Sequence, residues 1–426
     1  MRQSYNKSGN TTHLSFQYYV LVLIMLYISP LCVYLQSLWF ISTNMQAAIY
    51  IFLVILLSIA GERNKFQMHG LYVFWGVFMI FISFAALLSG GLLYFMQTSL
   101  LFVFLFFRRD TSAAINTCLW IIVAIGFLCA VACIIELFDY AFYRSFILPM
   151  FNTDNLGQIA RLYESKGTCG IMPQTSHAAG CILNAFYIIS TTHKYQYRTY
   201  LLILLFFGLV LTGKRAHLFF GMIVWLWSMI IGFTGSKKTQ RYLKIVILVM
   251  ILLLAFVIAQ PFLSQENTII KTYNTIVNFD INSDDTMHGR EFLYTKAIDM
   301  IKEAPLMGHG WGSFRTLIEY RGGSTDTHNV YLQLFAEMGV FVLAFFIVTA
   351  FAMLKRTNTL LKRCRKKYSN RNYVELLSLS FCFQAFFLFY SFTGNCLYNI
   401  DFFAIYTLGI CLTMRIDREL HLIKIT

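Results

Sequence analysis

The sequence predicts an all-α polytopic membrane protein, with about twelve transmembrane helices and a large outer loop before the tenth. The first observation is composition: of the 426 residues, 58% are hydrophobic and only 13% are charged, whereas soluble domains average about 45–50% apolar and about 25% charged residues. The second is a series of apolar runs, and the third is the placement of Lys and Arg around them. A water-soluble globular enzyme is excluded by the shortage of charge, and a disordered chain by the apolar excess.

Twelve apolar runs are candidates for membrane-spanning helices, and the whole chain, 1–426, is expected to form a single integral membrane domain. A helix needs about 20 residues to cross the hydrocarbon core. Several of the runs are shorter, so their polar flanks must also enter the membrane. The runs are Tyr19–Leu38, Ala47–Ala60, Leu71–Leu88, Leu92–Phe107, Ile115–Phe138, Ala178–Ser190, Tyr200–Leu211, Leu218–Phe233, Leu243–Phe262, Val330–Leu354, Val374–Phe392 and Ile400–Met414.

The basic residues predict which ends of these helices face the cytoplasm. With the N-terminus placed inside, most of the 34 Lys and Arg residues fall in the loops of that side. Because twelve is an even number, the C-terminus returns to the same side, and we expect both termini to be cytoplasmic. The basic run from Lys355 to Arg371 fits an anchor against anionic lipid better than a nucleic-acid patch, because no aromatic interleaving or RNA-binding motif accompanies it.

Two outer loops, 139–175 and 264–328, are longer than ordinary connections. Loops of more than about 12–15 residues are usually functional or disordered. Within the second loop, apolar residues recur at helical spacing from 290 to 304, which predicts an amphipathic helix ended by Pro305. We expect its apolar face to rest on the outer membrane–water boundary.

Among the basic residues of the predicted outer side, three are candidates for a functional role, because the positive-inside rule does not explain them. Lys214 and Arg215 open the eighth span, and Arg290 stands at the start of the amphipathic helix. Arg215 could instead reach lipid headgroups, and Arg290 could pair with an acid close to it in sequence. Guanidinium groups suit phosphate oxygens, and a helix N-terminus beside Arg290 would also attract anions. The pattern therefore favours an anion site on the outer face.

A histidine and a polar stripe mark the start of the tenth span. His328 is followed by Asn329, Gln333 and Glu337, which recur every four residues on an otherwise apolar helix. Polar groups within a membrane helix usually face a cavity or a partner helix. The stripe therefore predicts a wet cleft with His328 at its lip, although a histidine at a helix end can also be a cap. The outer loops contain no recognisable metal-ligand spacing, and no C-x-x-C pair occurs in the chain.

Several of these residues fall in motifs that resemble the O-antigen polymerase and O-antigen ligase family. The motifs are Gly289-Arg290, Glu303-Ala304-Pro305-Leu306-Met307-Gly308-His309-Gly310, His328-Asn329-Val330-Tyr331-Leu332-Gln333 and Glu337-Met338-Gly339, with Thr212–Ala216 as the arginine-bearing motif. The resemblance implies a GT-C-like, metal-independent membrane glycosyltransferase without a cofactor. Its expected location is the bacterial inner membrane, with the active site facing the periplasm.

The resemblance also implies roles for individual residues. Arg215 and Arg290 would hold the pyrophosphate of an undecaprenyl-pyrophosphate-linked oligosaccharide, and His328 would activate or orient the acceptor hydroxyl. His177, at the outer start of the sixth span, would line the acceptor side. Lys214 occupies a position where the family often has Ser or Thr, and it adds a cation. Membrane lipids and a chain-length regulator protein are the further partners implied; no nucleic acid is expected.

Three functions stay open at this point. A polymerase passes the growing glycan to a new lipid-linked repeat unit, whereas a ligase passes the finished polymer to lipid A–core. Both use the same donor chemistry, and we favour the polymerase. A polysaccharide flippase or another transporter is the minor alternative, because alternating access favours an internal repeat and charges at mid-membrane, and the unusual charges here lie at the outer edge.

Overall fold

The computed structural model describes residues 70–106, 112–150, 167–172, 174–192, 195–231, 240, 285–320, 323–324, 326–367 and 371–425. This part of the chain is helical apart from one antiparallel hairpin, in which β1 (Glu319–Tyr320) pairs with β2 (Gly323–Ser324). The predicted all-α class is therefore confirmed. The predicted runs Tyr19–Leu38, Ala47–Ala60 and Leu243–Phe262 lie outside the described residues.

Every other predicted span is occupied by a helix. These helices are α4 (Tyr72–Leu88), α5 (Leu92–Phe106), α6 (Ser112–Phe138), α9 (Thr175–Thr191), α10 (Arg198–Leu211), α11 (Arg215–Ile230), α16 (Val330–Lys367), α17 (Arg371–Tyr390) and α18 (Ile400–Ile425). Within the described residues, α6, α16 and α17 contain stretches long and apolar enough to cross a membrane, and α4, α10 and α11 are shorter apolar helices. The chain is a multi-pass membrane protein; the count of twelve spans and the GT-C-like arrangement stay predictions.

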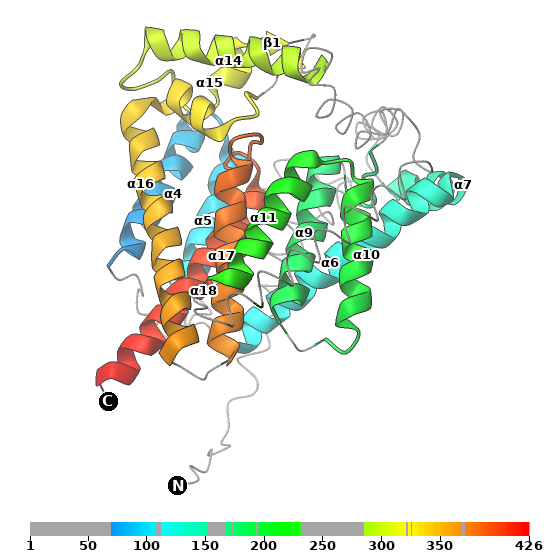
Figure 1. Ribbon diagram of the computed structural model, residues 1–426. Coiled ribbons are helices and arrows are strands. Elements are labelled where there is room, and N and C mark those ends of the chain that lie inside the picture. Colours follow the sequence, from blue (N-terminus) through cyan, green and yellow to red (C-terminus); the bar gives the residue numbers. More distant parts are fainter. Residues whose placement is uncertain are drawn as a thin grey trace.

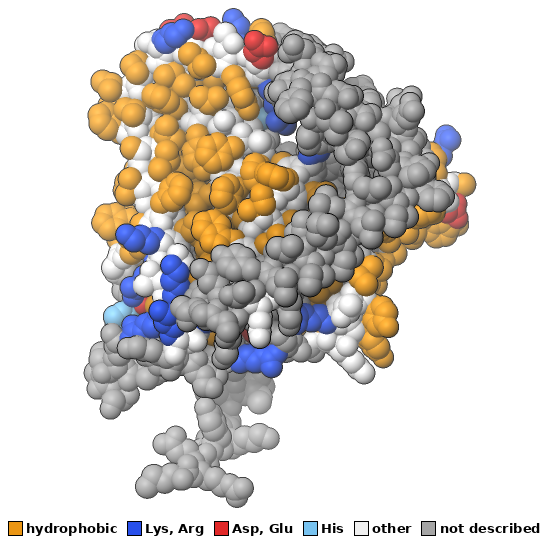
Figure 2. All heavy atoms as spheres, viewed as in Figure 1, with side chains coloured by type: hydrophobic (Ala, Val, Ile, Leu, Met, Phe, Trp, Pro, Cys, Tyr) orange, Lys and Arg blue, Asp and Glu red, His pale blue; other side chains and the backbone are white. Residues whose placement is uncertain are grey.

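The helices form a bundle whose sides carry apolar side chains. Figure 2 shows many hydrophobic side chains on the side of the bundle that carries α16, with Lys and Arg gathered near the end where the C-terminus lies. Phe74, Trp120 and Val348 are 53%, 60% and 67% exposed, which would be unfavourable in water and suits contact with lipid tails. Helix α17 lies in the interior, and most of its side chains are buried.

Several polar side chains inside the bundle pair with one another across helices. In the core, the Gln384 side-chain amide donates to Thr357 Oγ1 at 2.8 Å and to Ser380 Oγ at 2.9 Å. Towards the C-terminal end, Arg356 forms a two-pronged ion pair with Asp417, with N–O distances of 2.9 and 2.6 Å. These bonds connect α16 with α17 and α18. They stabilise the packing of the three helices, because a buried polar group is costly unless it is paired.

The loop predicted at 139–175 folds in part against α6. It begins with three short helical turns, α7 (Tyr140–Phe142), η1 (Tyr143–Ile147) and η2 (Leu148–Met150). Further along, the backbone N–H groups of Cys169 and Gly170 both donate to Glu136 Oε2 at 2.8 Å. The buried Glu136 carboxylate thus fixes the end of this loop next to the turn between α10 and α11, where the Thr168 N–H donates to the Leu211 carbonyl at 3.2 Å.

The second long loop forms a platform across the end of the bundle opposite the C-terminus (Figure 1). It contains α14 (Asp285–Glu303), α15 (Ser313–Leu317) and the hairpin. Helix α14 includes most of the expected amphipathic helix but begins at Asp285. Its apolar residues Leu293, Ala297 and Met300 are buried against Phe314 and Ala336. The expectation that this face rests on the membrane boundary is therefore wrong, because α15 and α16 cover it.

A break in α16 receives the loop that follows α14. Gly339 has φ 76° and interrupts the helix, which frees backbone carbonyls. His309 and Gly310 donate their N–H groups to the carbonyls of Ala336 and Glu337 at 3.2 and 2.7 Å, and Val340 donates to Pro305 at 3.0 Å. The two segments approach so closely that side chains at Gly308 or Gly339 would collide with the opposite backbone. Only glycine fits at such a crossing.

Candidate functional site

The turn between α10 and α11 presents cations at the end of the bundle that faces the platform (Figure 1). Gly213 adopts φ 65° and reverses the chain, and the Lys214 N–H donates to Thr212 Oγ1 at 3.4 Å. Arg215 is the first residue of α11. The first N–H groups of a helix have no acceptor within it and attract anions. Lys214, Arg215 and this helix end therefore combine three sources of positive potential.

The sequence suggested that Arg290 lies at a helix N-terminus, and the structure shows that it does not. It stands in the second turn of α14, because the helix already begins at Asp285. The helix end that can attract an anion is the start of α11, beside Arg215. Arg290 contributes its charge instead: it lies near enough to Lys214 and to His328 to change the pKa of each. The platform and the bundle thus face each other across a common cationic site.

The cations around His328 favour its uncharged form. The pKa of His328 lies below its usual value, mainly because the ring is desolvated and then because Arg290 and Lys214 repel a second positive charge; Asp326 opposes this shift. The pKa of Lys214 is also lowered, chiefly by burial, with a further contribution from Arg290. A neutral imidazole can accept a proton, as a general base must.

The backbone holds His328 in an uncommon conformation. Its φ is 57°, the only positive φ of a non-glycine residue in the described part of the chain. Such a conformation costs about 1 kcal/mol for a residue with a Cβ. On the C-terminal side, the Val330 N–H donates to the Ser391 carbonyl of the loop after α17 at 2.8 Å, which fixes the exit of the segment. Strain of this kind occurs most often where a side chain must be aimed.

The polar stripe of α16 has a structural role. The Asn329 side chain caps the helix by accepting from the N–H groups of Tyr331 and Leu332 at 3.0 and 3.1 Å, as N-cap residues do. Gln333 and Glu337 are fully buried. They bond to each other at 3.1 Å, so the expectation that they line a wet cleft is wrong.

Glu337 instead connects α16 with the platform and with the loop before α18. Its carboxylate accepts from the Gly312 N–H at 2.9 Å, the Phe314 N–H at 3.3 Å and the Tyr398 hydroxyl at 2.8 Å. Gln333 continues the network by donating to Asp326 Oδ1 at 2.9 Å. The stripe thereby stiffens the segment that carries His328.

Asp326 connects the same segment with α15. It accepts from Arg315 Nε at 2.6 Å and also contacts a second guanidinium nitrogen, which makes the pair two-pronged. This pair raises the pKa of Arg315, first through the hydrogen bond to Asp326. Arg315 is thus engaged with Asp326, whereas Lys214 and Arg290 supply charge to the site.

His177 pairs with a carboxylate that the sequence analysis did not single out. Its Nδ1 lies 2.5 Å from Asp401 Oδ2, which joins the first turn of α9 to the first turn of α18. Lys214 acts electrostatically on His177, so the pair borders the cationic site. A carboxylate in an otherwise apolar span is itself a signal of function, and this signal could have identified Asp401.

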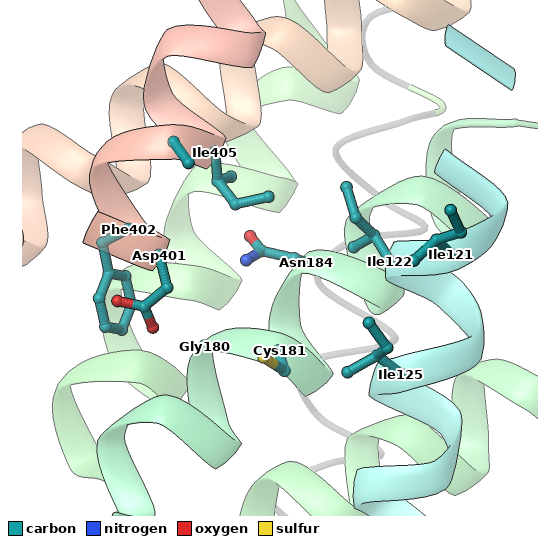
Figure 3. Close-up of a pocket in the computed structure, with 10 residues that line it drawn as sticks. Ile121, Ile122, Ile125, Gly180, Cys181, Asn184, Asp401, Phe402 and Ile405 are labelled. Carbon is teal, nitrogen blue, oxygen red and sulfur yellow. The ribbon is translucent and has the colours of Figure 1, made fainter. Parts of the chain in front are cut away.

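Beside this pair is a small pocket of about 50 Å³ between α6, α9 and α18. Figure 3 shows the Asp401 carboxylate and the Asn184 amide among isoleucine side chains, with the Phe402 ring next to Asp401. A largely apolar wall with a few polar groups is typical of ligand pockets. In the described part of the chain, no three His, Cys, Asp or Glu side chains are grouped as a metal site would require.

Comparison with known protein families gives one match. Residues 200–347 match the family model described as O-antigen ligase, and the resemblance inferred from the sequence is thereby confirmed over this segment. The match extends from α10 to the middle of α16 and includes Lys214, Arg215, Arg290 and His328, whereas His177 and Asp401 lie outside it. No curated protein matches the chain.

Proposed function

We propose that the chain is a membrane glycosyltransferase that uses a glycan linked to undecaprenyl pyrophosphate. The site is placed at the periplasmic face of the bacterial inner membrane, with both termini in the cytoplasm. The observation that carries the proposal is that Arg290 and Lys214, which immediately precedes the start of α11, both lie near enough to His328 to lower its pKa. Cations suit the pyrophosphate and a neutral imidazole suits the acceptor hydroxyl.

The reaction needs two events at this site. The acceptor hydroxyl oxygen forms a bond to the anomeric carbon of the donor glycan while its proton passes to His328. The bond between that carbon and the pyrophosphate oxygen breaks, and the lipid pyrophosphate leaves with the electron pair. Arg215, Arg290 and Lys214 stabilise the negative charge that grows on the leaving group, in the way that fixed cations stabilise a transition state. In this scheme the protein's own cations take the part that a metal ion plays elsewhere.

For the acceptor we propose a lipid-linked repeat unit, which makes the protein a polymerase of O-antigen or another surface polysaccharide. A ligase that transfers the glycan to lipid A–core is the second candidate, and the matching family model carries the description O-antigen ligase. Membrane lipids surround the bundle in either case. A chain-length regulator protein is a further partner of the polymerase.

The test is a reconstituted reaction in proteoliposomes. Purified protein is given undecaprenyl-pyrophosphate glycan with either a second lipid-linked repeat unit or lipid A–core as the acceptor. A ladder of longer lipid-linked glycans indicates a polymerase, and glycan on lipid A–core indicates a ligase. If neither product forms, and glycan-lipid instead crosses the bilayer, the proposed transferase is wrong and the protein is a transporter.

A further inference from the structure

A second histidine, His217, directly follows the arginine-bearing motif and has no role in the proposed reaction. His217 lies in the first turn of α11 and is fully buried. Neither of its ring nitrogens forms a hydrogen bond with any atom of the described chain. Leaving a buried polar group without a partner costs about 1–3 kcal/mol, and such groups in folded proteins call for an explanation.

The surroundings of His217 place it at the inner wall of the candidate site. Its ring packs on Tyr390 with centroids 4.2 Å apart and on Phe386 and Phe402 at 5.4 and 5.8 Å. The charges of Lys214 and His177 act on it. His217 thus sits between an aromatic cluster and the cations that face the donor.

Phe402 connects His217 with the His177–Asp401 pair and its pocket. The ring of Phe402 packs on His217 and also on His177, whose centroid is 5.9 Å away, and it borders the pocket drawn in Figure 3. One aromatic ring therefore contacts both His217 and a pocket that contains the Asp401 carboxylate and the Asn184 amide.

We infer that His217 is a positioning residue that binds a hydroxyl group of the glycan substrate during the proposed transfer reaction. A neutral imidazole offers one N–H donor and one acceptor nitrogen, which is the pair that a hydroxyl group uses. A phosphate oxygen only accepts hydrogen bonds, and the cations already bind the pyrophosphate in the proposed reaction. The unpaired ring nitrogens thus lower the stability of the folded protein, and substrate binding would satisfy them. Binding sites often combine lower stability with function in this way.

The inference rests on the proposed function, and its test compares His217→Phe with wild type in the same proteoliposome assay. Phenylalanine keeps the aromatic packing and removes both polar nitrogens. We expect its melting temperature to equal or exceed that of wild type, while kcat/KM falls about 10-fold or more, mainly through a higher KM for the glycan acceptor, because a hydroxyl would lose its partner. His217→Gln, which retains a donor and an acceptor, should recover part of the activity.

Tyr406→Phe is the matched control, because the buried Tyr406 hydroxyl also has no hydrogen-bond partner in the described chain and lies in the core of the bundle. It should leave kcat and KM unchanged. Wild-type kinetics in His217→Phe would overturn this inference alone, as would equal losses in His217→Gln and His217→Phe. Failure of the wild-type protein to form product would overturn both the inference and the proposed function.

Discussion

Thr327 and Asn329 bond to each other across His328. The Thr327 hydroxyl accepts from the Asn329 N–H at 3.0 Å and donates to the Asn329 carbonyl at 2.7 Å. Thr327 is itself buried and its N–H donates to Gln333 Oε1 at 3.2 Å. These two bonds hold the backbone of the intervening residue at a positive φ, so the point from which the imidazole projects is fixed on both sides.

The first prediction concerns pH. Transfer requires neutral His328, and the pKa of this residue lies below the usual histidine value of about 6.5. Activity should therefore be constant at neutral pH and should fall only at a pH below that value. Lys214→Gln removes one of the charges that lower this pKa, so the midpoint of the acid limb should move to higher pH. The measurement is kcat/KM from pH 4.5 to 8.

Lys302→Gln is the control for this shift, because Lys302 lies on the exposed face of α14 and is 72% exposed. Its acid limb should coincide with that of wild type. An acid limb in Lys214→Gln at or below the wild-type midpoint would contradict the coupling between Lys214 and His328.

The second prediction concerns the pyrophosphate. Arg215→Ala and Arg290→Ala should each lower kcat/KM about 10- to 150-fold, because each removes a charge-assisted contact worth roughly 1.5–3 kcal/mol. Lysine at either position should recover only part of the rate, since it lacks the planar fork of donors. Arg144→Ala, an exposed arginine of the first outer loop, should behave as wild type. Full activity in both site variants at matched protein levels would remove the support for pyrophosphate binding.

The third prediction concerns the crossing of α16 and the loop after α14. Gly339→Ala places a methyl group on the carbonyl of Leu306, so the folded protein should be lost or its melting temperature should fall by many degrees. Gly310→Ala is matched in backbone conformation, with φ 98° against 76°, but its Cβ would meet no atom of the described chain within 4 Å. It should cost only about 1–2 kcal/mol. Equal stability of the two variants in detergent would contradict the packing described here.

The fourth prediction concerns orientation. Cysteine introduced at the exposed Thr316 of α15 should react with a membrane-impermeant maleimide added to the periplasmic side, and cysteine at the exposed Lys362 of α16 should not. The platform and the C-terminus lie at opposite ends of the bundle (Figure 1), so the two labels must differ. Reaction of Lys362→Cys from the periplasmic side would reverse the topology and the placement of the site.

Much of this architecture follows from sequence pattern, because apolar length and Lys/Arg placement are local properties. The spans from α4 to α18 and the helix α14 were predicted on that basis. The burial of the polar stripe on α16 was not predicted. A spacing of four residues places Gln333 and Glu337 on one helix face but does not indicate what covers that face. The crossing of the two segments at Gly308 and Gly339 could not be predicted, and neither could the pair of His177 with Asp401, since each joins segments far apart in the chain.

The most direct test of the account replaces His328 with glycine. Glycine adopts a positive φ freely, so His328→Gly should keep the fold and the melting temperature of wild type and should still bind undecaprenyl-pyrophosphate glycan through the cations. Loss of the base should lower turnover by about 10²–10⁴-fold. His328→Asn, which also tolerates this conformation, should be equally inactive. A stable His328→Gly protein that retains more than about a tenth of wild-type turnover would contradict the central claim, that this imidazole takes the proton of the acceptor.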